Sequence, residues 1–443
     1  MKLFNEDSKE LIAELRKQKR DELVSQNYPD GSGHESIYRQ TTNYLIYLVL
    51  NEYLINDEEI NQLVYSLYHK MAACNPTIKP VKKILIERDG LLNAASYGEG
   101  TIILNIGLIA SAQSEEELAF ILAHEMAHYH LEHLKQRIEN HIDRNSYRPV
   151  MKRLKKIPEG NMTLEDLQFV QSWFTNFFKN SRGNELQADS LAMEMFYNCG
   201  FSKVGGLQVL EELKSVYQAP YPLNRNLFDE FIFDELPFKK RWLNTKKEQQ
   251  TDNIFNHLLN SDSISTHPDV DLRLEQLRAF KNPIEVASTP LPQSLIDRSK
   301  LELINSFYKY ELYDFGVHTA LQLKQISDSI SDIDFHISRM MYEIALAKND
   351  EILPKYVKRN TKSYPDETRA LNNFLYNLTA SEAAEISYLF ATKNFDPSNP
   401  NHYRILYRIH ELTNRLDKNK QLKKDFKKNF PKESITKYPD DKT

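Results

Sequence analysis

One short segment, His124-Glu125-Met126-Ala127-His128, constrains this chain more than any other part of its sequence. It lies in a predicted helix that starts after Ser114, has three acids in its first turn and runs to about Arg137. Because residues four apart share one face of a helix, both imidazoles can reach one metal ion at about 2.0–2.1 Å. Glu125 points beside that metal, where it can act as a general base toward water. The segment therefore predicts a zinc site with His124 and His128 as ligands and Glu125 as the catalytic base.

A third ligand has to come from elsewhere, because a catalytic zinc site uses three protein ligands and keeps a fourth position open. One class of sites takes a histidine six residues after the second one, but Leu134 occupies that position here. His130 and His133 lie on what we predict to be the same continuing helix, so neither can turn onto the same metal. We interpret both as surface residues or as outer support for the site.

Glu185 is the better candidate for the third ligand. It lies in a separate predicted helix, from Asn184 to about Tyr197, and its carboxylate would complete a His-His-Glu set of the gluzincin type. Asp189 follows one turn later, where it can accept the other ring N–H of a ligand histidine. The small Ala188 beside it indicates close packing against another helix. We therefore predict that Glu185 binds the metal and that Asp189 supports a ligand histidine.

His267 is a further candidate for the active site. The turn Thr266-His267-Pro268 fixes the backbone and presents the imidazole from a loop. The ring could stabilise the oxyanion of a tetrahedral intermediate, or it could occupy the open zinc position and hold the enzyme inactive. A loop histidine with neither role would simply be exposed. Arg273 follows six residues later and could anchor this loop by pairing with a carboxylate.

Charge and composition exclude several classes of protein. The formal net charge is -5, without the basic excess of a general nucleic-acid binder. Cys74 and Cys199 are too few for a disulfide framework, and their pairing cannot be inferred from the sequence. The charged N-terminus lacks the apolar core of a signal peptide, and no apolar run could span a bilayer. We expect no transmembrane segment and a cytoplasmic chain as written, or a periplasmic or envelope protein if a signal peptide has been removed.

The hydrophobic pattern predicts an α+β protein that is mostly helical. The chain has only 12 glycines, and apolar residues recur at helical spacing over most of its length. The one convincing sheet signal lies at residues 81–106, with strands at 81–87 and 101–105 and a glycine turn at 98–100 between them. Prolines at 283, 290 and 292 mark a boundary, after which the helical pattern resumes.

Four segments in order carry a resemblance to a known family: Asn93–Leu104, Glu116–His128, Ser181–Asp189 and Thr266–Arg273. Over about residues 55–280 the chain resembles the zinc metallopeptidases related to HtpX, the mitochondrial Oma peptidases, the prenyl-protein endopeptidases and the periplasmic BepA-like peptidases. Many members have glycine where this chain has Ala127. Because the chain lacks the long apolar helices of the integral-membrane members, it is most similar to the soluble, BepA-like branch.

The resemblance implies a residue-by-residue assignment. His124, His128 and Glu185 would bind one Zn2+ per chain, Glu125 would be the general base, Asp189 would support the ligands and His267 would lie at the mouth of the active site. The strand at 101–105 would offer its edge to a protein or peptide substrate, which binds as an added strand.

We expect four segments along the chain: a helical segment at 1–75 that packs on the peptidase, a zinc metallopeptidase domain at 76–282, a linker at 283–293 and a helical domain at 294–443. The spacing of Tyr310, Tyr313, Gly316 and Ala320 suggests degenerate tetratricopeptide-like repeats, with a non-repeat bundle as the equal alternative. The helical domain would bind a protein partner or substrate. The polar segment 218–265 could cover the cleft.

The predicted function is a zinc metalloendopeptidase that acts on proteins in quality control or processing. One rival is a zinc-stabilised chaperone or scaffold that binds proteins through its C-terminal helices. Glu125 argues against this rival, because a scaffold has no need of a general base. A second rival is a metal-dependent hydrolase of non-peptide bonds, which the expected substrate strand disfavours.

Overall fold

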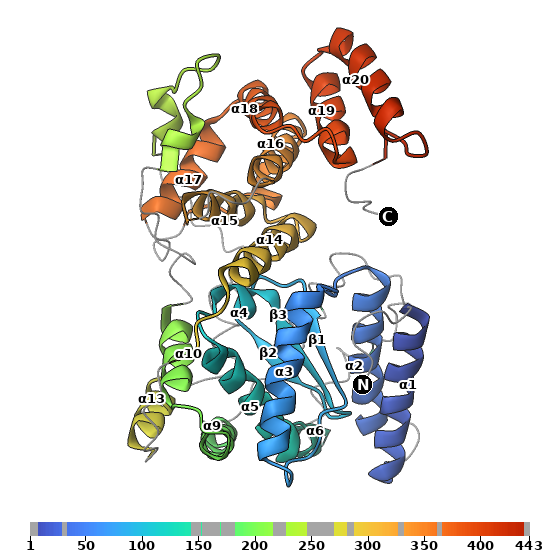
Figure 1. The fold of residues 1–443 in the computed structure, drawn as a ribbon, viewed down its shortest axis with the longest axis vertical. Coiled ribbons are helices and arrows are strands. Elements are labelled where there is room, and N and C mark those ends of the chain that lie inside the picture. Colours follow the sequence, from blue (N-terminus) through green and yellow to red (C-terminus); the bar gives the residue numbers. More distant parts are fainter. Residues whose placement is uncertain are drawn as a thin grey trace. The chain divides into compact units, whose positions relative to one another are not determined.

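A computed structural model describes residues 8–28, 33–142, 182–215, 227–245, 270–280, 288–326, 332–360 and 366–437, together with Lys152 and Phe169. The chain divides into two compact units, one of Met1–Val216 with Asn253–Ser299 and the other of Tyr217–Asp252 with Lys300–Thr443 (Figure 1). None of the described helices is long and apolar enough to cross a lipid bilayer. The predicted fold class, α+β and mostly helical, is confirmed.

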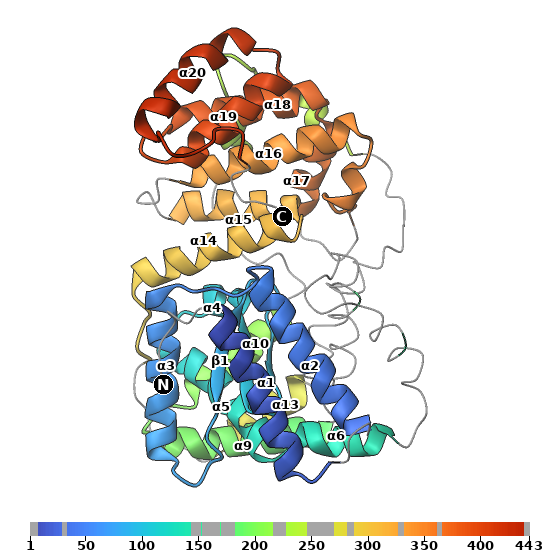
Figure 2. The ribbon, with the colours of Figure 1, turned by 90° about the vertical axis from the view of Figure 1, so that its right-hand side faces the viewer.

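The first unit consists of helices around one small sheet. Its elements before the metal-binding helix are α1 (Ser8–Ser25), α2 (Gly33–Leu50), α3 (Glu58–Cys74), β1 (Lys83–Glu87), β2 (Ala94–Ser96), β3 (Thr101–Asn105) and α4 (Ile106–Ser111). The others are α5 (Glu115–His130), α6 (His133–Ile142), α9 (Arg182–Asn198), α10 (Val204–Ser215) and α13 (Val270–Ala279). Figure 2 shows α1 and α2 side by side, and α2 also packs on α6.

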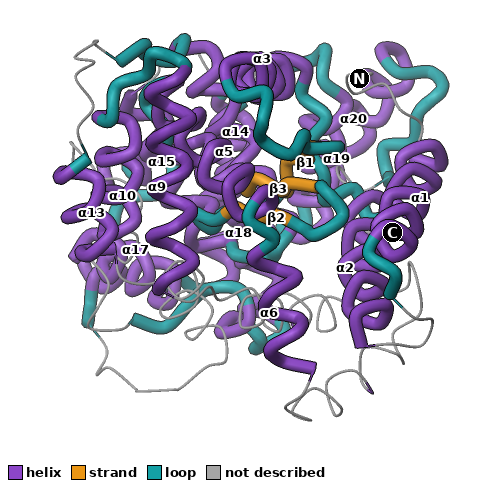
Figure 3. The backbone as a smooth tube through the Cα atoms, turned by 90° about the horizontal axis from the view of Figure 1, so that it is seen from below, coloured by secondary structure: helices purple, strands orange, loops and turns teal. Residues whose placement is uncertain are grey.

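The three strands form one sheet in the order β1-β3-β2. β1 and β3 are parallel, with Lys83 opposite Thr101, while β2 is antiparallel to β3, with Ala95 opposite Ile103. Every residue of β1 and β3 is buried, as expected for short apolar runs covered on both faces. Figure 3 shows these few strands among the helices of the chain.

The expectation that the strand at 101–105 offers its edge to a substrate is wrong. That strand is β3, the central strand, and both of its sides are paired with neighbours. The segment Ala94–Ser96 forms a strand of its own that occupies one side. The outer side of β1 is partly covered as well, because the Ile55 N–H donates to the Ile86 carbonyl oxygen at 2.9 Å. Among the described residues, the open edge of the sheet therefore belongs to β2.

Helix α5 is the centre of the first unit. The Ser114 hydroxyl accepts the Glu117 N–H at 3.3 Å, and the Glu117 carboxylate accepts the Gln113 N–H at 2.8 Å, which caps the first turn. All residues from Glu116 to Tyr129 are buried, since α5 packs against β2, α3, α9 and α10. A helix enclosed on all sides has little freedom to move, so the side chains that it carries are held in place.

The helix predicted to run to Arg137 is interrupted. α5 ends at His130 and α6 begins at His133, with Glu132 between them in the left-handed region at a φ of 55°. A periodic apolar pattern continues across such a turn, which is why the sequence did not reveal it. The turn changes the direction of the His133 side chain, which is buried rather than on the surface.

The second unit is built almost entirely of helices. After α14 (Gln293–Lys309), which begins in the first unit, they are α15 (Tyr313–Ile326), α16 (Ile333–Asn349), α17 (Asp366–Asn377), α18 (Ala380–Lys393), α19 (Pro400–Leu412) and α20 (Leu416–Asn429), with a short 3-10 turn, η4 (Leu353–Lys355). Gly316 allows α15 to approach α16 closely, since a Cβ there would lie 2.3 Å from the Met340 sulfur. Tetratricopeptide-like repeats stay a prediction.

The described part of segment 218–265 belongs to the core of the second unit. It contains two 3-10 turns, η1 (Leu227–Phe231) and η2 (Lys240–Leu243). Phe231 and Trp242 are fully buried, and their rings lie 4.6 and 5.7 Å from the Phe374 ring. These aromatic side chains anchor residues 227–245 in that unit.

Gly107 provides a test of how tightly the first unit is packed. Its N–H donates to the Asp89 carbonyl oxygen at 3.0 Å, and a Cβ there would lie 2.3 Å from the Gly90 carbonyl oxygen. We predict that Gly107→Ala lowers the free energy of unfolding by about 2–3 kcal/mol, because the obstructing atom is backbone. Gly200→Ala is the control: its φ is 74° but no atom lies within 4 Å, so the cost is about 1 kcal/mol. If urea unfolding showed Gly200→Ala to be less stable than Gly107→Ala, the tight packing around Gly107 would be contradicted.

Candidate metal centre

Three predicted ligands meet in the first unit. His124 and His128 come from α5 and Glu185 comes from α9, and ligand atoms of all three lie within 4.8 Å of one another. The two Nε2 atoms are 3.0 Å apart. The Glu185 oxygens lie 3.4 Å from His124 Nε2 and 3.3 Å from His128 Nε2. Ala188 is fully buried, and its small side chain allows α9 to lie close against α5.

Asp189 fixes the tautomer of His124. Its carboxylate oxygen lies 2.9 Å from His124 Nδ1, so the proton of the neutral ring resides on Nδ1 and Nε2 presents a lone pair. Burial alone lowers the pKa of His124, but the hydrogen bonds to Asp189 and Glu185 outweigh it and raise that pKa to about 9. The position in front of Nε2 therefore attracts positive charge.

A second chain of hydrogen bonds fixes His128. The Gln187 amide oxygen lies 3.2 Å from His133 Nε2, and His133 Nδ1 lies 2.8 Å from His128 Nδ1. Burial lowers the pKa of His133 and keeps its ring neutral. His133 then donates from Nε2 to Gln187 and accepts at Nδ1 from His128, which leaves a lone pair on His128 Nε2. Both ligand histidines thus turn bare nitrogens toward the same point.

Arg273, on α13, ties the carboxylates of α9 together. It donates from Nε to Asp189 at 2.7 Å and from a terminal nitrogen at 2.8 Å, and its other terminal nitrogen lies 3.2 Å from Glu185. Burial opposes the charge of Arg273, but Asp189 and Glu185 outweigh this effect and raise its pKa. Burial likewise opposes the charge of Asp189, but Arg273 outweighs it and holds the pKa of Asp189 at about 2. The expected pairing of Arg273 with a carboxylate is thus present.

The donor set and the local charge both fit a divalent cation. Two imidazoles and a carboxylate are the ligands that zinc prefers, whereas magnesium and calcium prefer oxygen alone. Three buried carboxyl groups, those of Glu125, Glu185 and Asp189, stand against one buried guanidinium, that of Arg273. A divalent ion between the two Nε2 atoms would offset this excess of acidic groups.

Glu125 is 2% exposed and lies one residue after the first ligand, near enough to influence the pKa of both Arg273 and Tyr97. Its charge therefore acts both on the arginine of the carboxylate cluster and on the tyrosine that follows β2. His130 supports a loop instead, because its Nδ1 accepts the Lys79 N–H at 3.0 Å. His267 lies outside the described residues.

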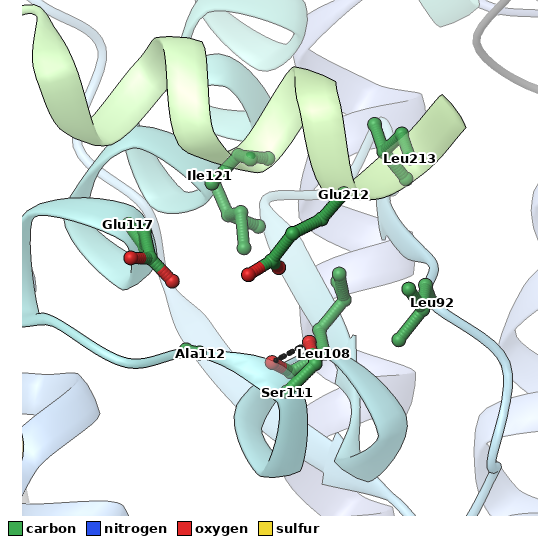
Figure 4. A pocket seen from close by; sticks show the side chains of 9 residues that line it. Leu92, Leu108, Ser111, Ala112, Glu117, Ile121, Glu212 and Leu213 are labelled. Atoms are coloured by element: carbon green, nitrogen blue, oxygen red, sulfur yellow. Dashed lines mark hydrogen bonds between the residues drawn. The ribbon is translucent and has the colours of Figure 1, made fainter. Parts of the chain in front are cut away.

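Two pockets flank β2. One lies at the C-terminal end of the strand and is lined by His128, Ser96, Tyr97 and Tyr129, among others. The other lies beyond its N-terminal end, where Leu92, Leu108 and Ile121 form apolar walls (Figure 4). Ile121 precedes Glu125 by one helical turn, so this pocket lies beside α5. Figure 4 shows the Glu212 carboxylate pointing into it, and burial raises the pKa of Glu212 to about 8.

Sequence reasoning missed Gln187, and it left His133 open between a surface position and outer support for the site. The contacts of both residues depend on the turn of the chain at Glu132, and such a turn leaves no periodic pattern in the sequence. The spacing between His128 and His133 would have drawn attention only if the helix had been known to end. Asp189 and Arg273 carried recognisable signals, a carboxylate one turn after a ligand and a basic residue after a turn.

The comparison with known proteins supports the family suggested by the motifs. Residues 55–281, just over half of the chain, match the profile described as Peptidase family M48. This chain belongs to peptidase family M48. The match spans the sheet, the histidine pair, Glu185 and Arg273, so the M48 region contains the whole centre described above.

The chain is also similar to a protein of Vibrio cholerae serotype O1 that carries the provisional name beta-barrel assembly-enhancing protease. The two are 34% identical over 102 residues, which is 23% of this chain and 21% of that protein. The chain therefore matches about a fifth of the length of this relative.

Arg273 provides a test of the charge balance in this M48 site. We predict that Arg273→Met lowers the free energy of unfolding by about 3–5 kcal/mol, because Asp189 and Glu185 lose their buried counter-charge. Arg273→Lys should recover only part of the loss, since lysine cannot make two parallel bonds. Gln276→Ala on the same helix is the control, as it removes an amide that donates to the Leu186 carbonyl oxygen at 2.8 Å. Equal urea midpoints for Arg273→Met and Gln276→Ala would contradict the role of Arg273.

Proposed function

We propose that this chain is a zinc-dependent metalloendopeptidase that hydrolyses peptide bonds in protein substrates. One observation carries the proposal: Nε2 of His124 and Nε2 of His128 lie 3.0 Å apart beside the buried Glu185 carboxylate. No neutral arrangement of these groups is favourable without a shared proton or a cation. Membership of a peptidase family makes zinc the cation that fits this set of donors.

In this proposal His124, His128 and Glu185 hold one zinc ion per chain. A zinc ion bound there acts as a Lewis acid that polarises the scissile carbonyl and increases the acidity of water. Asp189 and His133 keep the two ligand rings in the required tautomer, which makes the site ready before substrate arrives. Arg273 holds Asp189 in its ionised form and lies 3.2 Å from Glu185.

Glu125 is the proposed general base. It accepts the proton of the attacking water and returns it to the leaving amine, a transfer that its place beside the ligands allows. A carboxylate that carries a proton from water to the leaving amine has to face the substrate. In this proposal the substrate lies on the side of Tyr97, next to β2. For His267 we retain both proposed roles, support of the oxyanion or occupation of the open zinc position.

We place the substrate on β2. The Asn93 carbonyl accepts the Asn105 N–H at 3.0 Å and the Tyr97 N–H donates to the Thr101 carbonyl at 2.7 Å, both toward β3. Since alternate residues of a strand direct their backbone groups to opposite sides, Ala94 and Ser96 direct theirs to the open edge. An extended peptide can add to this edge as a further strand.

The direction of the added strand would determine which side of the scissile bond each pocket faces. An antiparallel peptide would place the residues after the scissile bond toward Leu92 and those before it toward Tyr97. The apolar pocket of Leu92, Leu108 and Ile121 would then receive a side chain from the carboxyl side of the bond. The pocket at His128 and Ser96 would receive one from the amino side.

The biological role is proposed at a coarser level. We propose that residues 76–282, apart from residues 227–245, which pack in the second unit, act as the peptidase domain and that the helical domain at 294–443 binds proteins. The name of the Vibrio cholerae relative refers to a protease that enhances beta-barrel assembly. We propose a role in protein quality control or processing, in the bacterial envelope if a signal peptide is removed, and the similarity over 102 residues supports it.

A non-enzymatic alternative is a zinc-stabilised chaperone or scaffold. It would need the histidines and Glu185 for stability, but it would have no use for Glu125. A chaperone would prevent the aggregation of an unfolded protein equally well with and without that carboxylate, and would leave the protein uncleaved.

The roles of Glu125 and Glu185 can be separated by matched variants. We predict that Glu125→Gln retains zinc but lowers kcat on an unfolded protein by at least about 100-fold. Glu185→Ala should lose zinc during dialysis, because two histidines alone bind it weakly. Glu194 is an exposed glutamate on α9, the helix that also carries Glu185. Glu194→Gln should therefore match the wild type in both zinc content and kcat. Full zinc in Glu185→Ala, or full activity in Glu125→Gln, would contradict the assignment.

The substrate strand can be tested at Ser96. We predict that Ser96→Pro lowers kcat/KM by about threefold to tenfold, because it removes one outward N–H while the bonds to β3 involve its neighbours. Ser96→Ala keeps that N–H and should behave as the wild type. Zinc content and the midpoint of thermal unfolding should stay unchanged in both. If Ser96→Pro cleaves normally, the substrate does not pair with β2 at this residue.

A further inference from the structure

The C-terminal ends of α3 and α9 are joined by one buried side chain, Asn75. Its Nδ2 donates to the Met71 carbonyl oxygen at 2.9 Å within α3 and to the Met195 carbonyl oxygen at 3.2 Å within α9. Its Oδ1 accepts from Nδ2 of Asn198 at 2.8 Å. Asn75 is 4% exposed, so these bonds are protected from competition with water. The two helix ends are therefore held at a fixed distance.

Cys199 is fixed in the same place, because it is the first residue after α9. The Phe201 N–H donates to the Phe196 carbonyl at 3.0 Å and the Gly200 N–H to the Tyr197 carbonyl at 3.1 Å, with Gly200 at a φ of 74°. This is a Schellman turn, which leaves the backbone of Cys199 little freedom. The direction of its side chain is thus set by the end of the helix.

The sulfur of Cys199 lies against the last turn of α3. It is 3.7 Å from the Lys70 carbonyl oxygen, 3.9 Å from the Met71 carbonyl oxygen and 3.4 Å from Nδ2 of Asn75. Cys74 belongs to this turn: it is the last residue of α3 and immediately precedes Asn75. Burial and the adjacent Cys74 thiol raise the pKa of Cys199 to about 12. Both cysteines are only partly buried, so a small reagent can reach them.

We propose that Cys74 and Cys199 form a disulfide by exchange with a disulfide donor, such as oxidised glutathione or a protein disulfide. The Cys74 thiolate attacks the donor, which releases one thiol and leaves a mixed disulfide on Cys74. The Cys199 thiolate then attacks Cys74, which releases the second donor thiol. In sum, two protein thiols are oxidised to one disulfide and one donor disulfide is reduced to two thiols.

This cross-link would stabilise the part of the chain that builds the metal centre. It closes a loop from the end of α3 to the end of α9, which contains the sheet, α5 and the candidate ligands His124, His128 and Glu185. Closing a long loop restricts the unfolded chain more than closing a short one. The cross-link would also hold α9, which carries Glu185 and Asp189, against α3. The inference concerns the fold and does not depend on the peptidase activity.

The experiment starts with reduced full-length protein, incubated with oxidised glutathione and then treated with an alkylating agent. Intact mass analysis should show a monomer that has lost two hydrogens and that carries neither glutathione nor alkyl groups. Cys74→Ser and Cys199→Ser should each retain one glutathione instead. Cys199→Ser should acquire it faster, because its remaining thiol is the proposed first nucleophile. Wild-type protein that keeps two alkylated cysteines, accumulates glutathione or forms covalent dimers would overturn the proposal.

Thermal unfolding provides a second readout. The oxidised wild type should unfold at a temperature at least about 5 °C above that of the reduced wild type. A variant with both cysteines replaced by serine should give the same midpoint with and without oxidised glutathione, which controls for effects of the reagent. An oxidised wild type with the midpoint of the reduced protein would overturn the proposed clamp on α9.

Discussion

The Nε2 atoms of His124 and His128, 3.0 Å apart and enclosed beside a carboxylate, are the constraint on which the rest of the first unit depends. Such an arrangement is unfavourable in an apolar interior unless a positive charge lies between the nitrogens. The fold maintains it through two outer chains of hydrogen bonds, from Asp189 to one ring and through His133 to the other. The stability of the interior and the readiness of the site for a cation are therefore two consequences of the same contacts.

The surrounding elements explain how those contacts are kept. α5 is buried along almost its whole length, and α9 approaches it closely because Ala188 is small. Arg273 brings α13 into the same network and offsets the charge of the carboxylates on α9. The sheet contributes the open edge of β2 next to this network, so that a site for a metal and a place for an extended chain lie together. A disulfide between α3 and α9 would reinforce the same helix from its other end.

Much of the site could be predicted from local chemistry. His124 and His128 are recognisable because helical spacing alone places them together, and Glu185 and Asp189 because a carboxylate pair one turn apart suits a ligand and its support. For His133 the choice between a surface position and outer support could not be made, since its contact depends on a two-residue turn with one positive φ. The edge strand was misplaced for a similar reason: Ala94–Ser96 has too few residues for an alternating pattern, so its pairing with β3 is decided by tertiary contacts. The contact of Cys199 with the turn of Cys74 joins residues 125 positions apart in sequence, beyond the reach of any local signal.

The most direct test of the central claim is X-ray absorption spectroscopy at the zinc edge on the purified full-length protein. The account predicts one zinc ion per chain with only nitrogen and oxygen neighbours at about 2.0–2.2 Å, including the scattering pattern of two imidazole rings. Sulfur neighbours at about 2.3 Å, or a single imidazole ring, would contradict it, because the zinc would then be held by other residues.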